Sequence, residues 1–239
     1  MMEDLFVLVF IVLVASFLQA STGFGFSIIG TPFLLAIYPV HEAIQINIIL
    51  SIFLSVFMIL KIKNELDKIL LQMLIKGSAI GMVGGIFIYL LIDVRWLKFS
   101  VGTLVLMLTV LLVLKFSIKR TNKKDIIVGG VSGLLTTSIG VPGPPLLLYF
   151  SSAKIDKYTL RSTTLAYYLF VYTGSLLMQI IFGGTSITIW KNSLTAIPAL
   201  FAGILMGQLL INRISQRTFR VITCVILIFT GIYLIITSF

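Results

Sequence analysis

Residues that form disulfides or bind transition metals are scarce in this sequence. Its 239 residues include one cysteine, Cys224, and one histidine, His41. A single cysteine excludes an intrachain disulfide and a Cys-x-x-Cys motif, and the two residues together do not supply the His and Cys ligands of a metal cage. We expect both residues to be structural, and we predict no metal site and no cofactor.

Charged residues are also few. They make up 11% of the chain against about 25% in typical soluble domains, whereas hydrophobic residues make up 59% against about 45–50%. The mean hydropathy is +1.14. Apolar runs of membrane-spanning length recur from one end of the chain to the other. The composition therefore predicts an all-α polytopic membrane protein with no appended soluble domain.

The charge that is present is mainly basic, with a formal net charge of +10. The Lys and Arg residues lie in short connections between apolar runs, where they report orientation in the membrane, so we expect no nucleic-acid partner. The first four residues, Met1 to Asp4, are acidic, whereas a cleavable signal peptide begins with a positive region. We therefore expect the chain from Leu5 onward to remain in the mature protein.

The most unusual stretch is SGLLTTSIGVPGPPLLLY, Ser132 to Tyr149, which sets three prolines and three glycines among apolar residues. Its arms are uncharged, so the break falls at membrane depth, where irregular backbone is tolerated only when it is buried in protein or lines a cavity. A helix kinked by one proline is the alternative. Pro142, Pro144 and Pro145 argue against it, because each removes an amide donor and bars the preceding residue from helical geometry.

A second broken segment is expected near the N-terminus. Leu5 to Val40 runs for 36 residues without a charge. As one helix it would be about 54 Å long, against a hydrocarbon core of about 30 Å. The segment must tilt steeply or break, and STGFGFSIIGTP, Ser21 to Pro32, is the place where we expect the break.

The order of elements repeats along the chain. The first broken segment, 5–40, precedes spans 43–60, 69–92 and 97–114, and the second, 126–153, precedes spans 162–182, 193–212 and 221–239. Within the repeat, Gly81 matches Gly203 and Gly85 matches Gly207 at a constant offset of 122. We predict two repeats, 1–118 and 126–239, joined by a basic cytoplasmic connection at 119–125.

The distribution of Lys and Arg predicts how the repeats are oriented. If 126–153 crosses the membrane once, nine basic residues lie inside and eight outside. If it dips in and returns, fourteen lie inside and only Arg95, Lys98 and Lys191 lie outside. The re-entrant arrangement makes the number of crossings in each half odd, so the repeats are inverted. Repeat symmetry and the acidic N-terminus favour a hairpin for 5–40 as well. The alternative is that 5–40 crosses the membrane once.

Inverted repeats with broken helices are a transporter architecture, in which half-helix N-termini point at a substrate near the midplane. Such an N-terminus offers unpaired amide donors and a partial positive charge, so it favours an anion. A hydroxyl in either break could instead bond back to a helix carbonyl. The hydroxyl residues and the glycines of the breaks are Ser21, Thr22, Gly23, Gly25, Ser27, Thr31, Thr136, Thr137, Ser138, Gly140 and Gly143.

Ionisable residues inside the spans are few. Lys76 and Arg161 could each attract an anion or extend to the inner interface. No Asp or Glu lies well inside a span, which weakens the hypothesis of a carboxylate proton relay. Other polar and aromatic residues could line a path or pack helices together. These residues are Gln19, Gln45, Asn47, Gln179, Tyr167, Tyr168 and Tyr172.

Two motifs resemble the paired Gly-rich, Pro-containing motifs of the TauE/SafE sulfite exporter family, also called the sulfonate uptake permease family. They are TGFGFSIIGTPFLL in the first half and SGLLTTSIGVPGPPLLLY in the second. The sequence departs from the usual pattern at Phe24 and Phe26, where glycines are common, and at Pro142. Carried over by position, the resemblance implies binding residues at Thr22, Gly23, Gly25, Pro32, Gly140, Gly143, Pro144 and Pro145.

The resemblance implies a multi-pass transporter of the cytoplasmic membrane for sulfite, sulfonates or related sulfur-containing anions, and no enzymatic activity. We expect alternating access, with the anion bound between the two breaks and the lipid bilayer around the protein. A permease for another small anion or a divalent metal ion is the first alternative, and the scarcity of carboxylate, imidazole and thiol ligands argues against the metal ion. A membrane scaffold without transport is the second. The sequence does not decide whether the protein forms a homo-oligomer.

Overall fold

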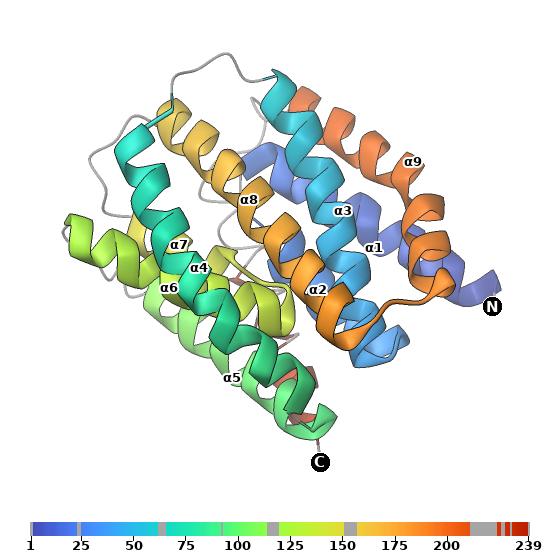
Figure 1. Ribbon diagram of the computed structural model, residues 1–239. Coiled ribbons are helices and arrows are strands. Elements are labelled where there is room, and N and C mark those ends of the chain that lie inside the picture. The colour runs from blue at the N-terminus through green and yellow to red at the C-terminus, as the bar shows by residue number, and fades with distance from the viewer. Residues whose placement is uncertain are drawn as a thin grey trace.

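A computed structural model describes residues 2–22, 25–61, 66–91, 93–113, 120–150, 157–210, 224–225, 228–229 and 231–238. The first half contains α1 (Met2–Thr22), α2 (Phe26–Ile37), α3 (Val40–Lys61), α4 (Lys68–Leu91) and α5 (Val94–Val113). The second half contains α6 (Asn122–Ile139), α7 (Gly143–Phe150), α8 (Lys157–Gly183) and α9 (Ile187–Leu210). Residues 231–236 are also helical (Figure 1).

The described residues contain no strand, and four of their helices, α3, α4, α8 and α9, are long and apolar enough to cross a membrane. Large apolar side chains such as Leu60, Ile80 and Ile181 are more than 70% exposed. Water would oppose such exposure, whereas lipid covers it. The predicted all-α polytopic membrane fold is confirmed.

The helices follow the expected spans. Spans 43–60, 69–92 and 97–114 correspond to α3, α4 and α5, and spans 162–182 and 193–212 correspond to α8 and α9. The last span, 221–239, is described only in part, and its residues 231–236 are helical.

One end of the bundle, here called the joint end, gathers the connections that carry the predicted inner charges. Lys61 Nζ donates to Gln208 Oε1 at 3.3 Å, so α3 and α9 both finish there. The backbone N–H of Asp67 donates to Thr163 Oγ1 at 2.9 Å, so α4 and α8 both begin there.

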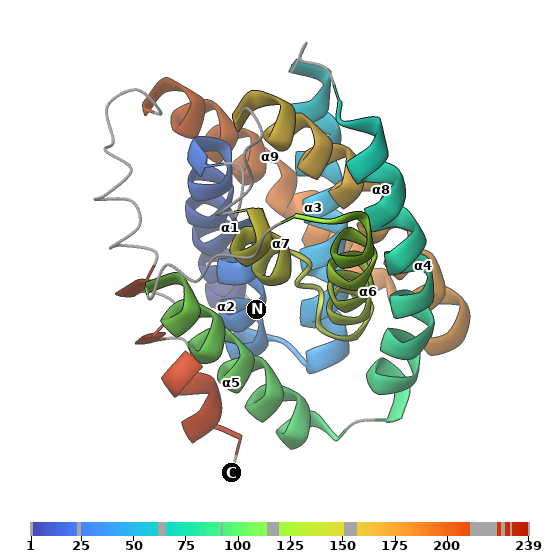
Figure 2. The same cartoon turned by 90° about the vertical axis from the view of Figure 1, so that its left-hand side faces the viewer.

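The opposite end, here called the far end, is built from the other termini of the same four helices. Gln45 Nε2 near the start of α3 donates to the carbonyl of Gly184, just after α8, at 2.8 Å. It also donates to the Tyr89 hydroxyl near the end of α4 at 3.2 Å. In both views α3 and α8 lie between the α1–α9 pair and the α4–α6 pair (Figures 1 and 2).

The second broken segment starts and finishes at the joint end. Tyr149 at the end of α7 donates its hydroxyl hydrogen to Asp125 Oδ1 in the first turn of α6, at 2.7 Å. Arg120 joins this pair to the start of α4, with Nε 3.3 Å from Asp125 Oδ2 and Nη1 2.9 Å from Asp67 Oδ2. The segment is therefore a hairpin whose tip lies inside the bundle, with α6 and α7 side by side (Figure 2).

The same contacts keep the Asp67 carboxyl charged. Its partial burial would raise the pKa, but the backbone hydrogen bond from Leu70 and the hydrogen bond and ion pair with Arg120 together lower the pKa of Asp67. The Arg120 guanidinium thus bridges two carboxylates at the joint end.

The first broken segment opens at the far end. Ser21 Oγ, at the end of α1, donates to the carbonyl of Gly207 near the joint end of α9 at 3.2 Å. After the tip, α2 runs back toward the far end, because α3 starts there and only Tyr38 and Pro39 separate the two helices. The two hairpins thus open at opposite ends. The charge distribution predicted the second hairpin, and repeat symmetry and the acidic N-terminus favoured the first.

The breaks form where the sequence disfavours continued helix. Gly140 ends α6 in the left-handed region (φ 73°), and its N–H still donates to the Thr136 carbonyl at 2.8 Å. Pro144 and Pro145 then fall in the first turn of α7, where a missing N–H removes no intrahelical bond. In the first hairpin, α2 begins at Phe26, directly after Gly25 (φ 128°). Pro32 lies inside α2 rather than at the break.

Glycines allow each hairpin to pack directly on a helix of the other half. A Cβ on Gly81 of α4 would overlap the Gly130 carbonyl of α6, and a Cβ on Gly203 of α9 would overlap the Leu13 carbonyl of α1. Gly85 and Gly207 make the corresponding contacts one turn further along. The glycines matched in the sequence are therefore matched in their packing, and they allow backbone-to-backbone contact.

Replacement of Gly81 by alanine should destabilise the protein, because the added methyl group would collide with backbone that cannot move independently. Overpacking of this kind costs about 1–3 kcal/mol. The matched control is Gly84→Ala on the same helix, where the added Cβ would lie 3.6 Å from Leu134 Cδ1, an ordinary contact. Unfolding of both variants in detergent measures the difference, and equal stability of the two would contradict this packing.

Replacement of Tyr149 by phenylalanine should loosen the second hairpin, since it removes a hydrogen-bond donor from Asp125, whose side chain is fully buried. A buried acceptor left without a donor costs about 1–3 kcal/mol. Tyr233→Phe, at a residue that is 41% exposed, is the control. Thermal unfolding should separate the two variants. Equal midpoints would show that this bond does not hold the hairpin.

Candidate functional site

Helix α2 begins inside the bundle. Its first residue, Phe26, is 1% exposed, and its N-cap, Gly25, has no side chain with which to cap the helix. The Phe26 N–H donates to Gln19 Oε1 of α1 at 2.7 Å. The first turn of α2 therefore brings amide donors and the positive end of a helix dipole into a buried region.

One face of α3 carries polar side chains at a spacing of four residues. Asn47, Ser51 and Ser55 are all at most 2% exposed. Asn47 Oδ1 and the Ser55 hydroxyl have no hydrogen-bond partner, and the Ser51 hydroxyl lies close to that of Tyr172. A buried hydroxyl in a helix commonly donates to a carbonyl one turn earlier, as Thr109 and Ser193 do. An unpartnered buried polar group costs about 1–3 kcal/mol. The face thus retains unused hydrogen-bonding capacity.

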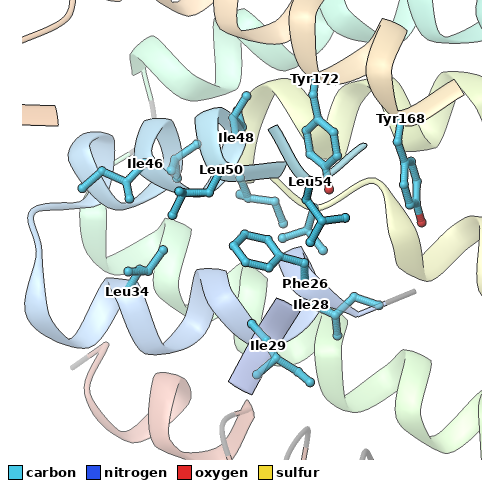
Figure 3. Packing of buried hydrophobic residues seen from close by; sticks show 14 of the residues in the cluster. Phe26, Ile28, Ile29, Leu34, Ile46, Ile48, Leu50, Leu54, Tyr168 and Tyr172 are labelled. Atoms are coloured by element: carbon cyan, nitrogen blue, oxygen red, sulfur yellow. The ribbon is translucent and has the colours of Figure 1, made fainter. Parts of the chain in front are cut away.

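The polar face of α3 lies beside the start of α2. The Tyr172 hydroxyl of α8 is close to the hydroxyls of both Ser27 and Ser51, so these two serines are at the same level. In Figure 3 the ring of Tyr172 points from α8 toward Phe26 at the start of α2. Ser55 lies one turn beyond Ser51, about 6 Å nearer the joint end at 1.5 Å per residue. The Ser51 hydroxyl therefore lies at the level of the first turn of α2, and the Ser55 hydroxyl lies one turn nearer the joint end on the same face of α3.

The tip of the second hairpin reaches the same region. A Cβ on Gly143 would lie 3.1 Å from Ile28 Cδ1 of α2 and 3.1 Å from the Tyr168 hydroxyl of α8. Figure 3 shows Tyr168 directed toward the side on which Ile28 lies. Asn47 Nδ2 of α3 donates to the Gly140 carbonyl at 2.9 Å. The starts of α2 and α7 therefore meet between α3 and α8.

The carbonyl ends of α1 and α6, which carry the negative ends of their dipoles, are covered by side-chain donors. Arg161 Nη2 donates to the Ala20 carbonyl at 2.9 Å, and Gln179 Nε2 donates to the Thr137 carbonyl at 2.8 Å. Asn47 does the same for Gly140. The negative ends are covered, whereas at the start of α2 the Gln19 side chain accepts from one amide, the Phe26 N–H. The polarity of this region therefore suits an anion.

The structure brings together part of the predicted set of binding residues. Gly25 and Ser27 lie at the start of α2, and Gly140 and Gly143 lie at the second tip beside them. Thr31, one turn along α2 from Ser27, is fully buried, and its hydroxyl has no partner. Pro144 and Pro145 follow Gly143 in the first turn of α7.

Other predicted residues have structural partners. Ser21 Oγ donates to the Phe17 carbonyl at 2.8 Å, and Ser138 Oγ donates to the Leu134 carbonyl at 2.7 Å, so both bond back to their own helices. The Thr137 hydroxyl lies 2.7 Å from the Ser175 hydroxyl of α8. Arg161 caps α1. The Thr22 side chain and Gly23 lie outside the described residues.

Ser51 and Ser55 were not among the predicted binding residues. The spacing Asn47, Ser51, Ser55 in an otherwise apolar span would have revealed a polar helix face, although not the absence of partners. Lys76, considered as an anion ligand, is exposed on α4. Within the described residues, no group of three or more His, Cys, Asp or Glu side chains could hold a metal ion.

Comparison with known proteins identifies the family. Residues 8–234 match the family model described as Sulfite exporter TauE/SafE, which covers nearly the whole chain. The chain belongs to the TauE/SafE sulfite exporter family. No curated protein and no solved structure matches it. The two motifs that carry the resemblance in this TauE/SafE protein contain Gly25 and Gly140, the glycines at the two helix breaks.

Replacement of Ser55 by alanine should leave stability unchanged or raise it, because the hydroxyl removed has no partner in the folded protein. Ser175→Ala is the contrast, since it strands the buried Thr137 hydroxyl and should cost about 1–2 kcal/mol. Thermal unfolding without added solute compares the two. A clear loss of stability in Ser55→Ala would show that its hydroxyl serves the fold.

Proposed function

We propose that this protein transports a small sulfur-containing anion, such as sulfite or a sulfonate, across the cytoplasmic membrane. The observation that carries the proposal is the buried start of α2 at the level of the Ser51 hydroxyl, with the unpartnered Ser55 hydroxyl one turn further along α3. A tetrahedral or pyramidal oxyanion can accept hydrogen bonds from such hydroxyls and from helix amides at the same time. Membership of a transporter family supports this reading, which assigns no catalytic role to any residue.

The anion would bind between the two hairpin tips, where Gly143 and the start of α2 meet. Because glycine has no Cβ, the backbone of the second tip approaches Tyr168 and Ile28 closely. Ser27 and Tyr172 supply further hydroxyls at the same level. Donors from both halves would then contact one substrate, as in transporters built from inverted repeats.

Alternating access would use the way the hairpins are packed. The first hairpin is fastened to α9 through Gly203 and Gly207, and the second to α4 through Gly81 and Gly85. Each unit combines a hairpin of one half with a spanning helix of the other, with α3 and α8 between the units. We propose that these units rock against each other and expose the site at the joint end, which faces the cytoplasm, and at the far end in turn.

Flux into proteoliposomes tests the transport proposal. The wild-type protein should move sulfite or methanesulfonate faster than empty vesicles do, and Ser51→Ala and Ser55→Ala should each lower the rate about tenfold, which corresponds to about 1.4 kcal/mol. Ser193→Ala is the control, because its hydroxyl only bonds back to the Ile189 carbonyl near the far end of α9.

Two results would count against this function. Wild-type protein that moves none of sulfite, methanesulfonate or another small anion is not an anion transporter, and a parallel assay with Mn²⁺ would identify a cation permease. If flux is present but unaffected by both α3 substitutions, transport occurs at another place in the protein.

A further inference from the structure

We infer that the site accepts anions of a single negative charge, such as hydrogensulfite or a monosulfonate, and discriminates against dianions such as sulfate and fully deprotonated sulfite. The inference rests on the proposed function and adds the charge of the substrate. It follows from which charges the interior contains and which it lacks.

Among the described residues, the fully buried polar side chains are neutral with one exception, Asp125. Asp125 is at the joint end, where Tyr149 and Arg120 contact it. The side chains around the start of α2 are hydroxyls and two amides. They are Gln19, Ser27, Asn47, Ser51, Ser55, Tyr168 and Tyr172.

Positively charged side chains are also rare in the described part of the interior. No described Lys or Arg is fully buried, and Lys76 is exposed on α4. Arg161 is partly buried and donates to the Ala20 carbonyl, at the negative end of the α1 dipole. Its charge is therefore partly balanced before any substrate binds.

The positive potential at the start of α2 is that of a helix N-terminus, equivalent to about half an elementary charge. Neutral hydroxyls solvate an anion but do not cancel its charge. Because the self-energy of a buried ion rises with the square of its charge, a dianion loses about four times as much solvation energy as a monoanion of equal size. The positive charge available to a substrate is that of the helix N-terminus together with the part of the Arg161 charge that the α1 dipole does not balance, about one elementary charge in all. A site of this charge favours the monoanion.

Thermal stabilisation of the purified wild-type protein tests this inference without depending on flux. Methanesulfonate is singly charged throughout the range from about pH 6 to about pH 9, sulfate is doubly charged, and sulfite loses its second proton near the middle of that range. Methanesulfonate should stabilise equally at all pH values. Sulfite should lose affinity about tenfold per pH unit above its own pKa, and sulfate should bind at least about tenfold more weakly than methanesulfonate.

A variant with an added charge provides the second arm. Ser55→Lys places a cation beside the start of α2 and should raise the affinity for sulfate relative to methanesulfonate by about tenfold or more. Leu60→Lys is the control on the same helix, because Leu60 is 78% exposed and its substitution should leave the preference unchanged. If Ser55→Lys does not fold, the binding of the three anions to the wild-type protein at different pH values decides the charge inference.

The outcomes separate the two proposals. Sulfate that binds as well as methanesulfonate, or sulfite affinity that does not fall with rising pH, overturns the charge inference and leaves anion transport standing. If no anion binds and none crosses the membrane, the transport function fails and the charge inference fails with it.

Discussion

The structure depends on satisfying helix ends that lie inside a membrane protein. Helices α1 and α6 stop within the bundle, and water does not reach most of their last carbonyls. Side chains of α3 and α8 supply the missing donors: Asn47 covers Gly140, Gln179 covers Thr137 and Arg161 covers Ala20. This requirement explains why polar residues interrupt the two central helices. It also gives the site its sign, since the negative helix ends are covered, whereas at the start of α2 the Gln19 side chain accepts from the Phe26 N–H alone.

Backbone contact through glycines connects the two halves into a structure that can move. The close α4–α6 and α1–α9 contacts join a hairpin of one half to a spanning helix of the other. Such contacts resist bending within a unit because a packed interface has few alternative arrangements. Movement between the units would instead pass through α3 and α8, whose side chains line the candidate site. Stability within a unit and movement between the units would thus depend on different helices.

The sequence predicted the features that local chemistry decides. Apolar run lengths identified the spans, and clustered glycines and prolines identified both breaks to within a few residues. The Lys and Arg distribution predicted the second hairpin, and repeat symmetry and the acidic N-terminus favoured the first. The contacts of Tyr149 and Ser21 place the two hairpins so that they open at opposite ends. The sequence predicted less accurately which hydroxyl side chains bond to a carbonyl of their own helix and which do not. Ser21 and Ser138 bond back to their own helices, whereas Ser51 and Ser55, which were not predicted, do not.

The sequence by itself therefore determined the class of the protein, the position of its breaks and the pairing of its glycines, because hydropathy, proline sterics and the absence of a Cβ act over a few neighbouring residues. Only the tertiary structure decided which hydroxyls are available to a substrate. That property depends on what the adjacent helix places opposite each side chain: Ser175 stands opposite Thr137, whereas Ser55 has no partner. The spacing of residues along one helix does not contain that information.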